Sequence, residues 1–259
     1  MLPTVMTIAG SDPCAGAGLQ ADLKTIAALG GYGASVVTAI TVQNSVQVSQ
    51  VHPVSGALVA AQMQAVLSDM PIKAIKLGML GNREVVEAVC HVLMDYPDIP
   101  VVADTVLRGS AGGALLADED VAHFVENLLP RCQLITPNLD EAVRLSGNMP
   151  VSGVADLEPL ARHLMGLGCE GVVLTGGHLA GDQVVDTLVY GSTLKRWVNE
   201  RIEDQQGFHG TGCTLASAVA VGVAKGLDKV MAVEAGIAYV RQAIHRRIKL
   251  GHGQYFLGH

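Results

Sequence analysis

The sequence predicts an α/β fold in which a mostly parallel, doubly wound sheet is covered by helices on both faces. Short aliphatic runs alternate with longer segments of helical periodicity along almost the whole chain, as in parallel sheets with crossover helices. Hydrophobic residues make up 49 % of the 259 residues and aromatic residues only 3 %, so the predicted core is aliphatic. Gly191-Ser192 separates two β-like runs and predicts one small β-hairpin. No internal repeat or long linker interrupts the chain, and we therefore expect a single domain over residues 1–259.

The predicted strands are short runs of aliphatic and β-branched residues that end in a glycine, a turn residue or a polar residue. The first ends before Gly10, and the second ends at Gln43-Asn44. The last two form the hairpin. In chain order the strands are Val5–Ala9, Ser35–Val42, Ala74–Leu77, Pro100–Ala103, Gln133–Thr136, Gly171–Leu174, Val184–Tyr190 and Leu194–Val198.

The predicted helices carry apolar residues three or four positions apart and have recognisable ends. Ser55, Asn82 and Asp118 are expected N-caps, because their side chains accept hydrogen bonds from first-turn N–H groups. The tail, Gly251–His259, has no such pattern and is expected to be loosely ordered. In chain order the helices are Leu19–Leu29, a segment from Ser55 to Met70, Arg83–Tyr96, a segment from Asp118 to Leu129, a turn from Leu139, Asp156–Leu167, Leu215–Gly226 and Asp228–Leu250.

Charge and cysteine usage exclude several classes of protein. A formal net charge of −7 at pH 7 argues against a nucleic-acid partner. The five cysteines are scattered without a Cys-x-x-Cys motif, which argues against a disulfide framework or a zinc site and fits a reducing compartment. The N-terminus has no basic leader, and no apolar run reaches membrane-spanning length. We therefore expect a cytoplasmic protein with no membrane partner.

A glycine-rich loop, Gly10–Gly18, joins the first predicted strand to the first helix. It has neither the Gly-x-Gly-x-x-Gly spacing of dinucleotide-binding loops nor the Gly-Lys-Ser/Thr of a Walker loop. Its small residues allow a flat ligand to lie against the backbone. The alternative interpretation is a plain strand-to-helix turn.

Polar residues lie at the carboxyl ends of predicted strands, where open parallel sheets bind ligands. Gln43 and Asp104 each follow a strand, and Asn138 and Glu141 follow another. Asp104 and Glu141, with Asn138 nearby, are an oxygen-rich set of the kind that binds Mg²⁺ through carboxylates and water. The alternative for Glu141 is a helix cap.

The segment Gly207–Thr214 contains three glycines and Cys213, directly before a run of small and apolar residues. A turn that leads straight into a helix leaves the first N–H groups unpaired, and with the positive end of the helix dipole they form an anion site. Cys213 at this place is expected to have a lowered pKa and to act as a base or nucleophile. The alternative is a tight turn in which Cys213 is a small buried apolar residue. An anion site beside a Mg²⁺ site implies phosphoryl transfer from a nucleotide.

Seven short motifs, spread over nearly the whole chain, occur in the order found in one enzyme family. They are Ile8–Pro13, Gly16–Thr25, Thr38–Asn44, Ile75–Gly81, Ile135–Glu141, Gly176–His178 and His209–Thr214. Through them the sequence resembles the hydroxymethylpyrimidine/phosphomethylpyrimidine kinases, the thiamin-pathway branch of the ribokinase-like superfamily. Each motif alone is a weak signal, but the ordered set is specific.

The resemblance implies a ribokinase-like three-layer α/β/α sandwich, the use of ATP with Mg²⁺, and a homodimer. It implies two successive reactions, on the hydroxymethyl group of 4-amino-5-hydroxymethyl-2-methylpyrimidine and then on the resulting monophosphate.

The resemblance also assigns roles to individual residues. The Gln43 amide would read the aminopyrimidine edge by accepting from the 4-amino group and donating to a ring nitrogen. Cys213 would stand where most ribokinase-like enzymes have an aspartate base. The remaining assignments are Gly10, Ala17, Met79 and Val106 around the pyrimidine, Gly210 and Gly212 in the anion hole, Asn138, Thr175 and Thr211 at the nucleotide, and Asp104 and Glu141 at the metal.

Two departures from the family pattern concern the phosphates. Thr175 stands where family members usually carry a lysine, and Gly109–Gly112 stands where they often have Ala-Lys-Ser-Gly. Two expected cations are therefore missing, and Arg108 is a candidate replacement.

Two other functions stay open. The first is a pyridoxal kinase, a close relative, against which Gln43 argues because pyridoxal lacks the 4-amino group. The second is a non-catalytic pyrimidine-binding module that has lost its kinase chemistry with the lysines. The presence of Asp104, Glu141 and Cys213 argues against this second function.

Overall fold

The computed structural model describes residues 2–107, 118–179, 181–202, 204 and 206–259. Its centre is one nine-stranded sheet, and its strands are β1 (Thr4–Ser11), β2 (Tyr32–Gln43), β3 (Val48–Pro53), β4 (Ala74–Leu77), β5 (Val101–Ala103), β6 (Leu134–Ile135), β7 (Gly171–Leu174), β8 (Gln183–Tyr190) and β9 (Thr193–Glu200). The spatial order is β3-β2-β1-β4-β5-β6-β7-β8-β9. Pairing is parallel from β2 to β7 and antiparallel at both edges, so the carboxyl ends of six strands meet along one side of the sheet.

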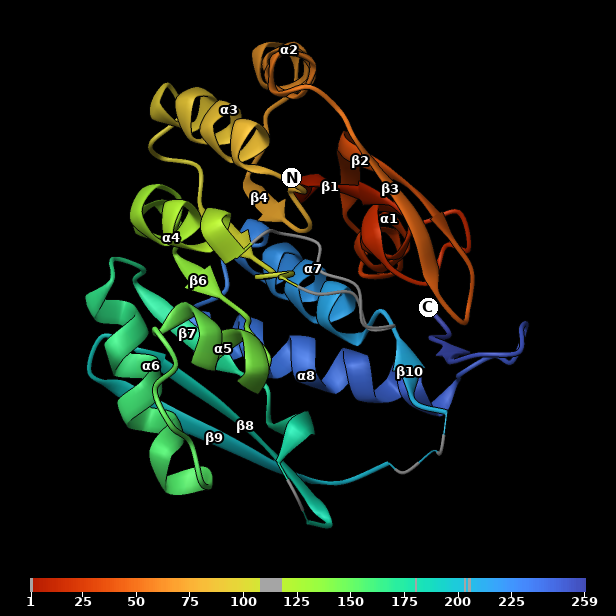
Figure 1. Ribbon diagram of the computed structural model, residues 1–259, viewed down its shortest axis with the longest axis vertical. Coiled ribbons are helices and arrows are strands. Elements are labelled where there is room, and N and C mark those ends of the chain that lie inside the picture. The colour runs from red at the N-terminus through yellow and green to blue at the C-terminus, as the bar shows by residue number, and fades with distance from the viewer. Residues whose placement is uncertain (1, 108–117, 180, 203, 205) are drawn as a thin grey trace.

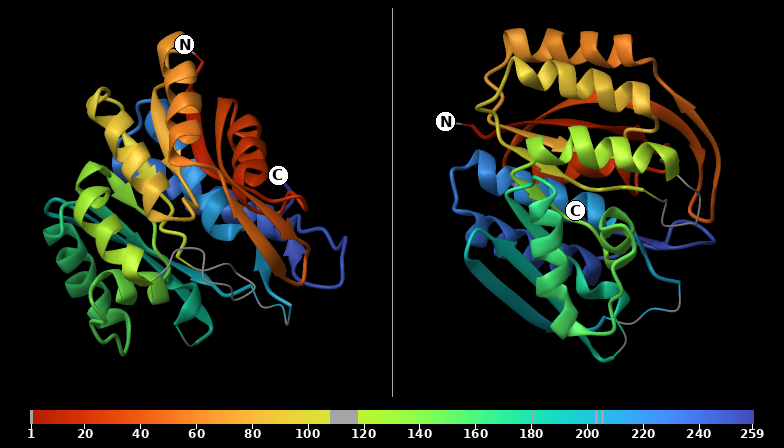
Figure 2. Two further views of the ribbon diagram at one scale, coloured as in Figure 1. Left: turned by 45° about the horizontal axis from the view of Figure 1, so that its top comes forward. Right: turned by 60° about the vertical axis from the view of Figure 1, so that its left-hand side comes forward.

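Helices cover both faces of this sheet (Figures 1 and 2). They are α1 (Gly18–Ala28), α2 (Gly56–Asp69), α3 (Arg83–Met94), α4 (Asp118–Asn127), α5 (Leu139–Leu145), α6 (Leu157–Gly166), α7 (Thr211–Ala224) and α8 (Lys229–His245). Helices α2–α6 pack on one face, and α1, α7 and α8 pack on the other. Side chains alternate accordingly, since Met6 and Ile8 of β1 enter the first core and Val5 enters the second. The predicted three-layer α/β/α sandwich is confirmed.

Helix α7 carries the site through the middle of the second core. Every residue from Thr214 to Ala224 is buried, because α1, α8 and the sheet enclose the helix. Small residues permit this close packing, and a side chain at Gly222 would press on Ala232 of α8. The start of α7 is thereby fixed at the carboxyl ends of the strands.

Three local predictions are wrong. Edge strand β3 was not expected, because only Val48 and Val51 are aliphatic in a segment that otherwise lies at the surface. The last helix ends at His245 and not at Leu250. The tail is ordered by pairing, because β11 (Tyr255–Phe256) pairs in parallel with β10 (Phe208–His209).

Candidate active site

A cavity of about 1980 Å³ opens at the carboxyl ends of the parallel strands. The fold brings together side chains that are up to two hundred positions apart in the sequence. All the residues predicted to form the site line this cavity; they are Gly10, Ala17, Gln43, Met79, Val106, Asp104, Asn138, Glu141, Thr175, Gly210, Thr211, Gly212 and Cys213.

One end of the cavity is built on Asp12, a residue that the sequence analysis did not single out. Asp12 is buried, and its carboxylate accepts hydrogen bonds from the backbone N–H groups of Cys14 at 2.9 Å, Gly16 at 3.0 Å and Ala17 at 2.8 Å. His209 Nε2 lies 3.0 Å from the same carboxylate. Burial alone would raise the pKa of Asp12, but the hydrogen bonds from His209 and from the loop lower it below its ordinary value. Asp12 therefore holds the glycine-rich loop and His209 together as an ionised carboxylate.

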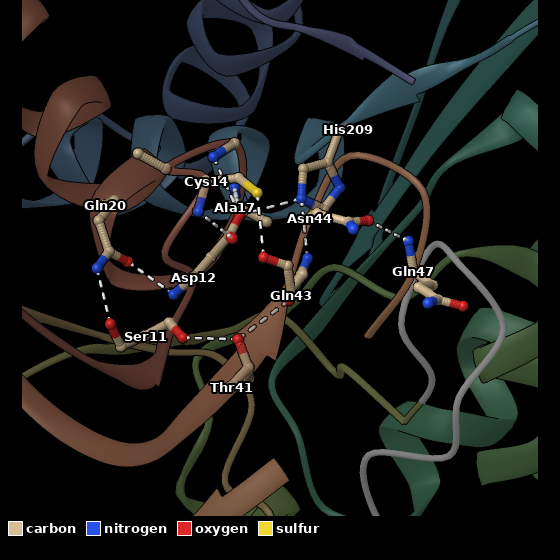
Figure 3. Close-up of polar contacts among 12 residues, drawn as sticks. Ser11, Asp12, Cys14, Ala17, Gln20, Thr41, Gln43, Asn44, Gln47 and His209 are labelled. Carbon is tan, nitrogen blue, oxygen red and sulfur yellow. Dashed lines mark hydrogen bonds and ion pairs between the residues drawn. The ribbon is translucent and has the colours of Figure 1, made fainter. Parts of the chain in front are cut away.

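Gln43 lies against this pair at the end of β2 (Figure 3). Its side-chain amide is 3.1 Å from His209 Nε2 and 3.3 Å from Thr41 Oγ1. The Cys14 thiol donates to the main-chain carbonyl oxygen of Gln43 at 3.3 Å, which fixes the backbone at this residue. The side-chain amide is fixed at the cavity wall by His209 on one side and Thr41 on the other.

Met79 lies in the wall of the same cavity. The Thr38 hydroxyl donates to the Met79 carbonyl oxygen at 2.6 Å, which fixes the backbone after β4. A Cβ on Gly10 would stand 3.2 Å from Met79 Sδ, so glycine lets the two residues lie close together without crowding. Val106 is half-buried and completes an apolar wall suited to a flat ring.

The start of helix α7 forms another part of the wall. Gly210 adopts the left-handed conformation with φ 85° and no side chain caps the helix. Helix α7 begins at Thr211, four residues earlier than predicted, so the N–H groups of Thr211, Gly212 and Cys213 belong to its first turn. A Cβ on Gly212 would be 3.4 Å from Asp104 Oδ1, which places the Asp104 carboxylate beside this turn.

Asp104 and Glu141 are two buried carboxyl groups on the cavity wall. Asp104 Oδ2 has no hydrogen-bond partner among the described residues. Burial and repulsion by Asp104 raise the pKa of Glu141 to about 8. Glu141 also caps α5, because its Oε2 accepts from the Asn138 N–H at 3.0 Å while Asn138 Oδ1 accepts from the Glu141 N–H. The interpretation of Glu141 as a helix cap is therefore confirmed, and its role as a Mg²⁺ ligand stays a prediction.

The chain matches the family model described as phosphomethylpyrimidine kinase over residues 12–257. It belongs to that family. A hydroxymethylpyrimidine/phosphomethylpyrimidine kinase of Rhizobium meliloti is 44 % identical over 256 residues, which cover 98 % of this chain and 96 % of the relative. The protein is therefore a kinase.

Solved structures agree with this family. An ADP complex of Bacillus subtilis pyridoxal kinase has a TM-score of 0.91 at 32 % identity and covers 100 % of this chain and 98 % of the other. A phosphomethylpyrimidine kinase from Clostridium difficile has a TM-score of 0.82 at 34 % identity, covering 94 % and 100 %. A kinase fold shared with an ADP complex supports ATP as the phosphate donor. None of the described helices is long and apolar enough to cross a membrane.

Lys76 is a further residue of this kinase that the sequence analysis did not single out. Its ammonium is fully buried in β4, 2.9 Å from both oxygens of Asp22 and 3.9 Å from Asp104 Oδ2. Asp22 also accepts from the Thr7 hydroxyl at 2.5 Å and the Ser217 hydroxyl at 2.8 Å. Burial opposes the charge, but Asp22 and Asp104 outweigh it and raise the pKa of Lys76. The sequence signal that could have identified Lys76 was a single lysine within an otherwise aliphatic strand.

The predicted lowering of the Cys213 pKa is wrong. Burial raises the pKa of the thiol well above its ordinary value, and the Asp104 and Asp22 carboxylates add to this effect, while Lys76 opposes it. Burial raises the pKa of the neighbouring Asp104 carboxyl as well, although the Lys76 ammonium and the Cys213 thiol oppose this rise. A helix N-terminus activates an exposed thiol, and the sequence does not reveal the two carboxylates beside this one.

Thr175 is the residue predicted to stand in place of a lysine of the family. Thr175 lines the cavity and bridges to Asn138 along the sheet. The following turn is fixed by Arg201, whose guanidinium donates to the carbonyl oxygens of Gly177 at 2.8 Å and Gly181 at 2.8 Å. Arg108 and Gly109–Gly112 lie outside the described residues.

Proposed function

We propose that this kinase transfers the γ-phosphate of ATP to the hydroxymethyl group of 4-amino-5-hydroxymethyl-2-methylpyrimidine and then phosphorylates the resulting monophosphate, as a step of thiamin biosynthesis. One observation carries the proposal: a fixed amide, Gln43, and an uncapped helix start, α7, line the same cavity. An aminopyrimidine with a hydroxymethyl group needs these two features together. The name of the Rhizobium meliloti relative supports the same substrate.

At the pyrimidine end, Gln43 accepts from the 4-amino group and donates to a ring nitrogen. Met79 and Val106 contact the faces of the ring, and Gly10 and Ala17 leave room for it. An amide can satisfy a donor and an acceptor on one edge at once, as it does with adenine.

At the phosphate end, the N–H groups of Gly210–Cys213 bind phosphate oxygens at the positive end of the α7 dipole. Asn138, Thr175 and Thr211 contact the nucleotide. Asp104 and Glu141 suit Mg²⁺, because Asp104 Oδ2 is buried without a hydrogen-bond partner in the described chain and Glu141 is repelled by Asp104. Mg²⁺ held by Asp104 and Glu141 would supply positive charge to offset that of the phosphates. The described residues contain no group of three or more His, Cys, Asp or Glu that could hold a metal, so the protein would contribute two carboxylates to this site.

Cys213 is the base for the first reaction in this proposal. Its thiolate accepts the alcohol proton as the oxygen–phosphorus bond forms. The thiol is the main form at neutral pH, because burial raises its pKa. The fixed charge of Lys76 reduces the free energy needed to form the thiolate.

A second candidate is phosphorylation of pyridoxal, which the likeness to the Bacillus subtilis pyridoxal kinase favours. A coupled assay of ADP release with the aminopyrimidine alcohol and with pyridoxal separates the two. We expect turnover of the alcohol at the higher kcat/KM. A higher value for pyridoxal would overturn the proposal, and pyrimidine binding without ADP release would indicate a non-catalytic module.

Replacement of Gln43 tests the pocket assignment. Gln43→Leu leaves the polar edge of the pyrimidine unpaired, at about 1–3 kcal/mol per group, so kcat/KM for the alcohol should fall at least about tenfold. Gln64→Leu, at an exposed site on α2, is the matched control. An unchanged kcat/KM in Gln43→Leu would contradict the assignment.

We further propose that the kinase is a cytoplasmic homodimer. The side chains of Ile40 and Val42 on β2 and Val46 in the following turn are 58 %, 47 % and 54 % exposed, which suits a face between two copies. Light scattering after size exclusion should give twice the mass of the chain. The mass of one chain at micromolar concentration would contradict the dimer.

A further inference from the structure

His209 and Asp12 form a buried pair (Figure 3). This pair joins the loop before α7 to the pyrimidine end of the cavity. We propose that His209, held by Asp12, is a positioning residue that fixes the orientation of the Gln43 side-chain amide and thereby the order of donor and acceptor offered to the substrate. The inference rests on the proposed function, in which Gln43 reads the edge of the pyrimidine.

The position of the proton on His209 follows from Asp12. Asp12 Oδ2 accepts from the N–H groups of Gly16 and Ala17, and Oδ1 accepts from the N–H of Cys14. A carboxylate surrounded by donors is ionised, and it cannot donate to an imidazole nitrogen 3.0 Å away. His209 Nε2 must therefore carry the hydrogen and donate it to Asp12.

The His209 ring cannot turn away from this contact. The residue is 4 % exposed, and the Phe256 ring packs edge-on against it with centroids 6.0 Å apart. A side chain at Gly16 would collide with both rings, so the glycine-rich loop closes on His209.

The hydrogen on His209 decides which end of the Gln43 amide faces it. A half turn of the amide exchanges its nitrogen and oxygen, and only the hydrogen bonds distinguish the two arrangements. An NH₂ group 3.1 Å from His209 Nε2 would set one donor against another. The carbonyl oxygen of the amide can instead share the same N–H with Asp12 in a three-centre hydrogen bond, and this arrangement is the compatible one.

Thr41 leads to the same orientation independently. Its hydroxyl has one hydrogen, which it donates to the Ser11 carbonyl oxygen at 2.9 Å. The Gln43 atom 3.3 Å from Thr41 Oγ1 must then be the donor, which is the NH₂ group. The amide therefore directs its oxygen to His209 and its nitrogen to Thr41.

A fixed amide selects between two kinds of pyrimidine edge. The 4-amino substrate offers a donor at position 4 and an acceptor at the adjacent ring nitrogen. Its 4-oxo analogue offers the reverse order, an acceptor at position 4 and an N–H beside it. To bind the analogue in the same pose, the amide would have to turn over and lose its contacts to His209 and Thr41.

The test is the ratio of kcat/KM for the 4-amino alcohol to that for the 4-oxo analogue. We expect His209→Leu to lower this ratio about tenfold or more, because the amide can then turn and accept the analogue. His209→Gln keeps a donor and should retain most of the ratio, and Thr41→Val should lower it less than His209→Leu. His91→Leu, on the exposed surface of α3, is the matched control. A purely structural role would reduce both kcat/KM values equally, and an unchanged ratio in His209→Leu overturns the proposal.

A measurement without substrate keeps the proposal testable if His209→Leu does not fold. The ¹⁵N spectrum of the unsubstituted protein should show a hydrogen on His209 Nε2, and an unprotonated Nε2 overturns the proposal. Failure of the proposed function is recognised separately, because the unsubstituted protein would then not phosphorylate the 4-amino alcohol at all, whereas the His209 tautomer is read from the protein alone.

Discussion

The two ends of the cavity differ in how their polar groups are satisfied. At the pyrimidine end, the protein itself holds Asp12, His209 and Gln43 in a closed set of hydrogen bonds. At the phosphate end, within the described chain, no side chain caps α7 and Asp104 Oδ2 has no hydrogen-bond partner. The hydrogen bonds of the first region are complete without a ligand, so this region is preorganised to select a ring. The polar groups of the second region find all their partners only when a charged ligand is bound. Substitutions in the second region should therefore change rates and charge balance, and those in the first should change substrate choice.

The largest effect expected at the phosphate end is that of Cys213→Ala. An alcohol must lose its proton as it attacks, and a positioned base contributes typically about 10²–10⁴-fold. The monophosphate attacks through an oxygen that is already negative, and the backbone N–H groups of α7 survive the substitution. We therefore expect the first reaction to fall by about that factor while the second is largely spared.

The pH dependence of the first reaction supplies a further test of Cys213. Because the folded-state pKa of the thiol is raised, its thiolate fraction increases with pH through and above the ordinary thiol pKa of about 8.5. The first reaction should accelerate over this range in the unsubstituted enzyme and not in Cys213→Ala. Cys90→Ala, on α3 outside the cavity, is the control. Equal losses in both reactions would mean that Cys213 only shapes the start of the helix.

Lys76→Met tests the charge beneath the phosphate end. Removal of the ammonium leaves Asp22 buried and facing Asp104 without a cation between them, and breaking such a buried pair costs about 3–5 kcal/mol. Urea unfolding should show this loss. The double variant Lys76→Met with Asp22→Asn should recover part of it, because the unpaired charge is then removed. Lys195→Met, exposed on β9, should stay close to the unsubstituted protein, and a similar small change in Lys76→Met would contradict the role of this pair.

Polar residues at the ends of strands could be identified from the sequence, whereas contacts between distant motifs could not. Gln43, Asp104 and Asn138 could be placed at one edge of the sheet, because parallel strands carry their carboxyl ends to the same side. The Asp12–His209 contact joins residues 197 positions apart, and neither local pattern indicates the other. Lys76 and Asp22 are likewise 54 positions apart.

The wrong predictions have a common physical origin. The Cys213 pKa depends on burial and on neighbouring carboxylates, which are tertiary properties. The C-terminal segment Gly251–His259 is ordered by Phe256, which is buried against His209. Nine residues are too few to show a periodic pattern that would predict this burial. Edge strand β3 is mostly exposed and carries little aliphatic pattern. The local sequence signals of the C-terminal segment and of β3 are weak, and tertiary contacts determine the structure of both segments.

A smaller effect is expected from the titration of Glu141. The pKa of Glu141 is about 8 in the folded protein, against about 4.3 for a free side chain, so between these values only the folded state retains the proton. Stability should therefore fall as pH rises through this window, by on the order of 1–3 kcal/mol. Mg²⁺ competes with the proton, and its stabilisation should be larger at about pH 9 than at about pH 6. Thermal unfolding with and without Mg²⁺ measures both effects.

Two variants make the Glu141 measurement specific. Glu141→Gln should flatten the pH dependence and reduce the stabilisation by Mg²⁺. Glu234→Gln, exposed on α8, should change neither. A Mg²⁺ effect that is equal at both pH values would exclude Glu141 as a ligand.

The smallest effect expected is a gain from Thr175→Lys, which places a cation in the wall of the phosphate end. Thr175 is half-buried, so a lysine there remains partly solvated, and such a contact is worth up to about 1 kcal/mol, or roughly fivefold in rate. The second substrate brings an additional phosphate into the cavity, and we therefore expect kcat/KM to rise more for the monophosphate than for the alcohol. The gain should shrink at high salt, because partly exposed charges are screened. Thr193→Lys, exposed at the start of β9, adds the same charge away from the cavity and should leave both reactions unchanged. An equal gain for both substrates would assign the new lysine to the nucleotide alone, and no gain would show that the phosphate end is not short of positive charge at this position.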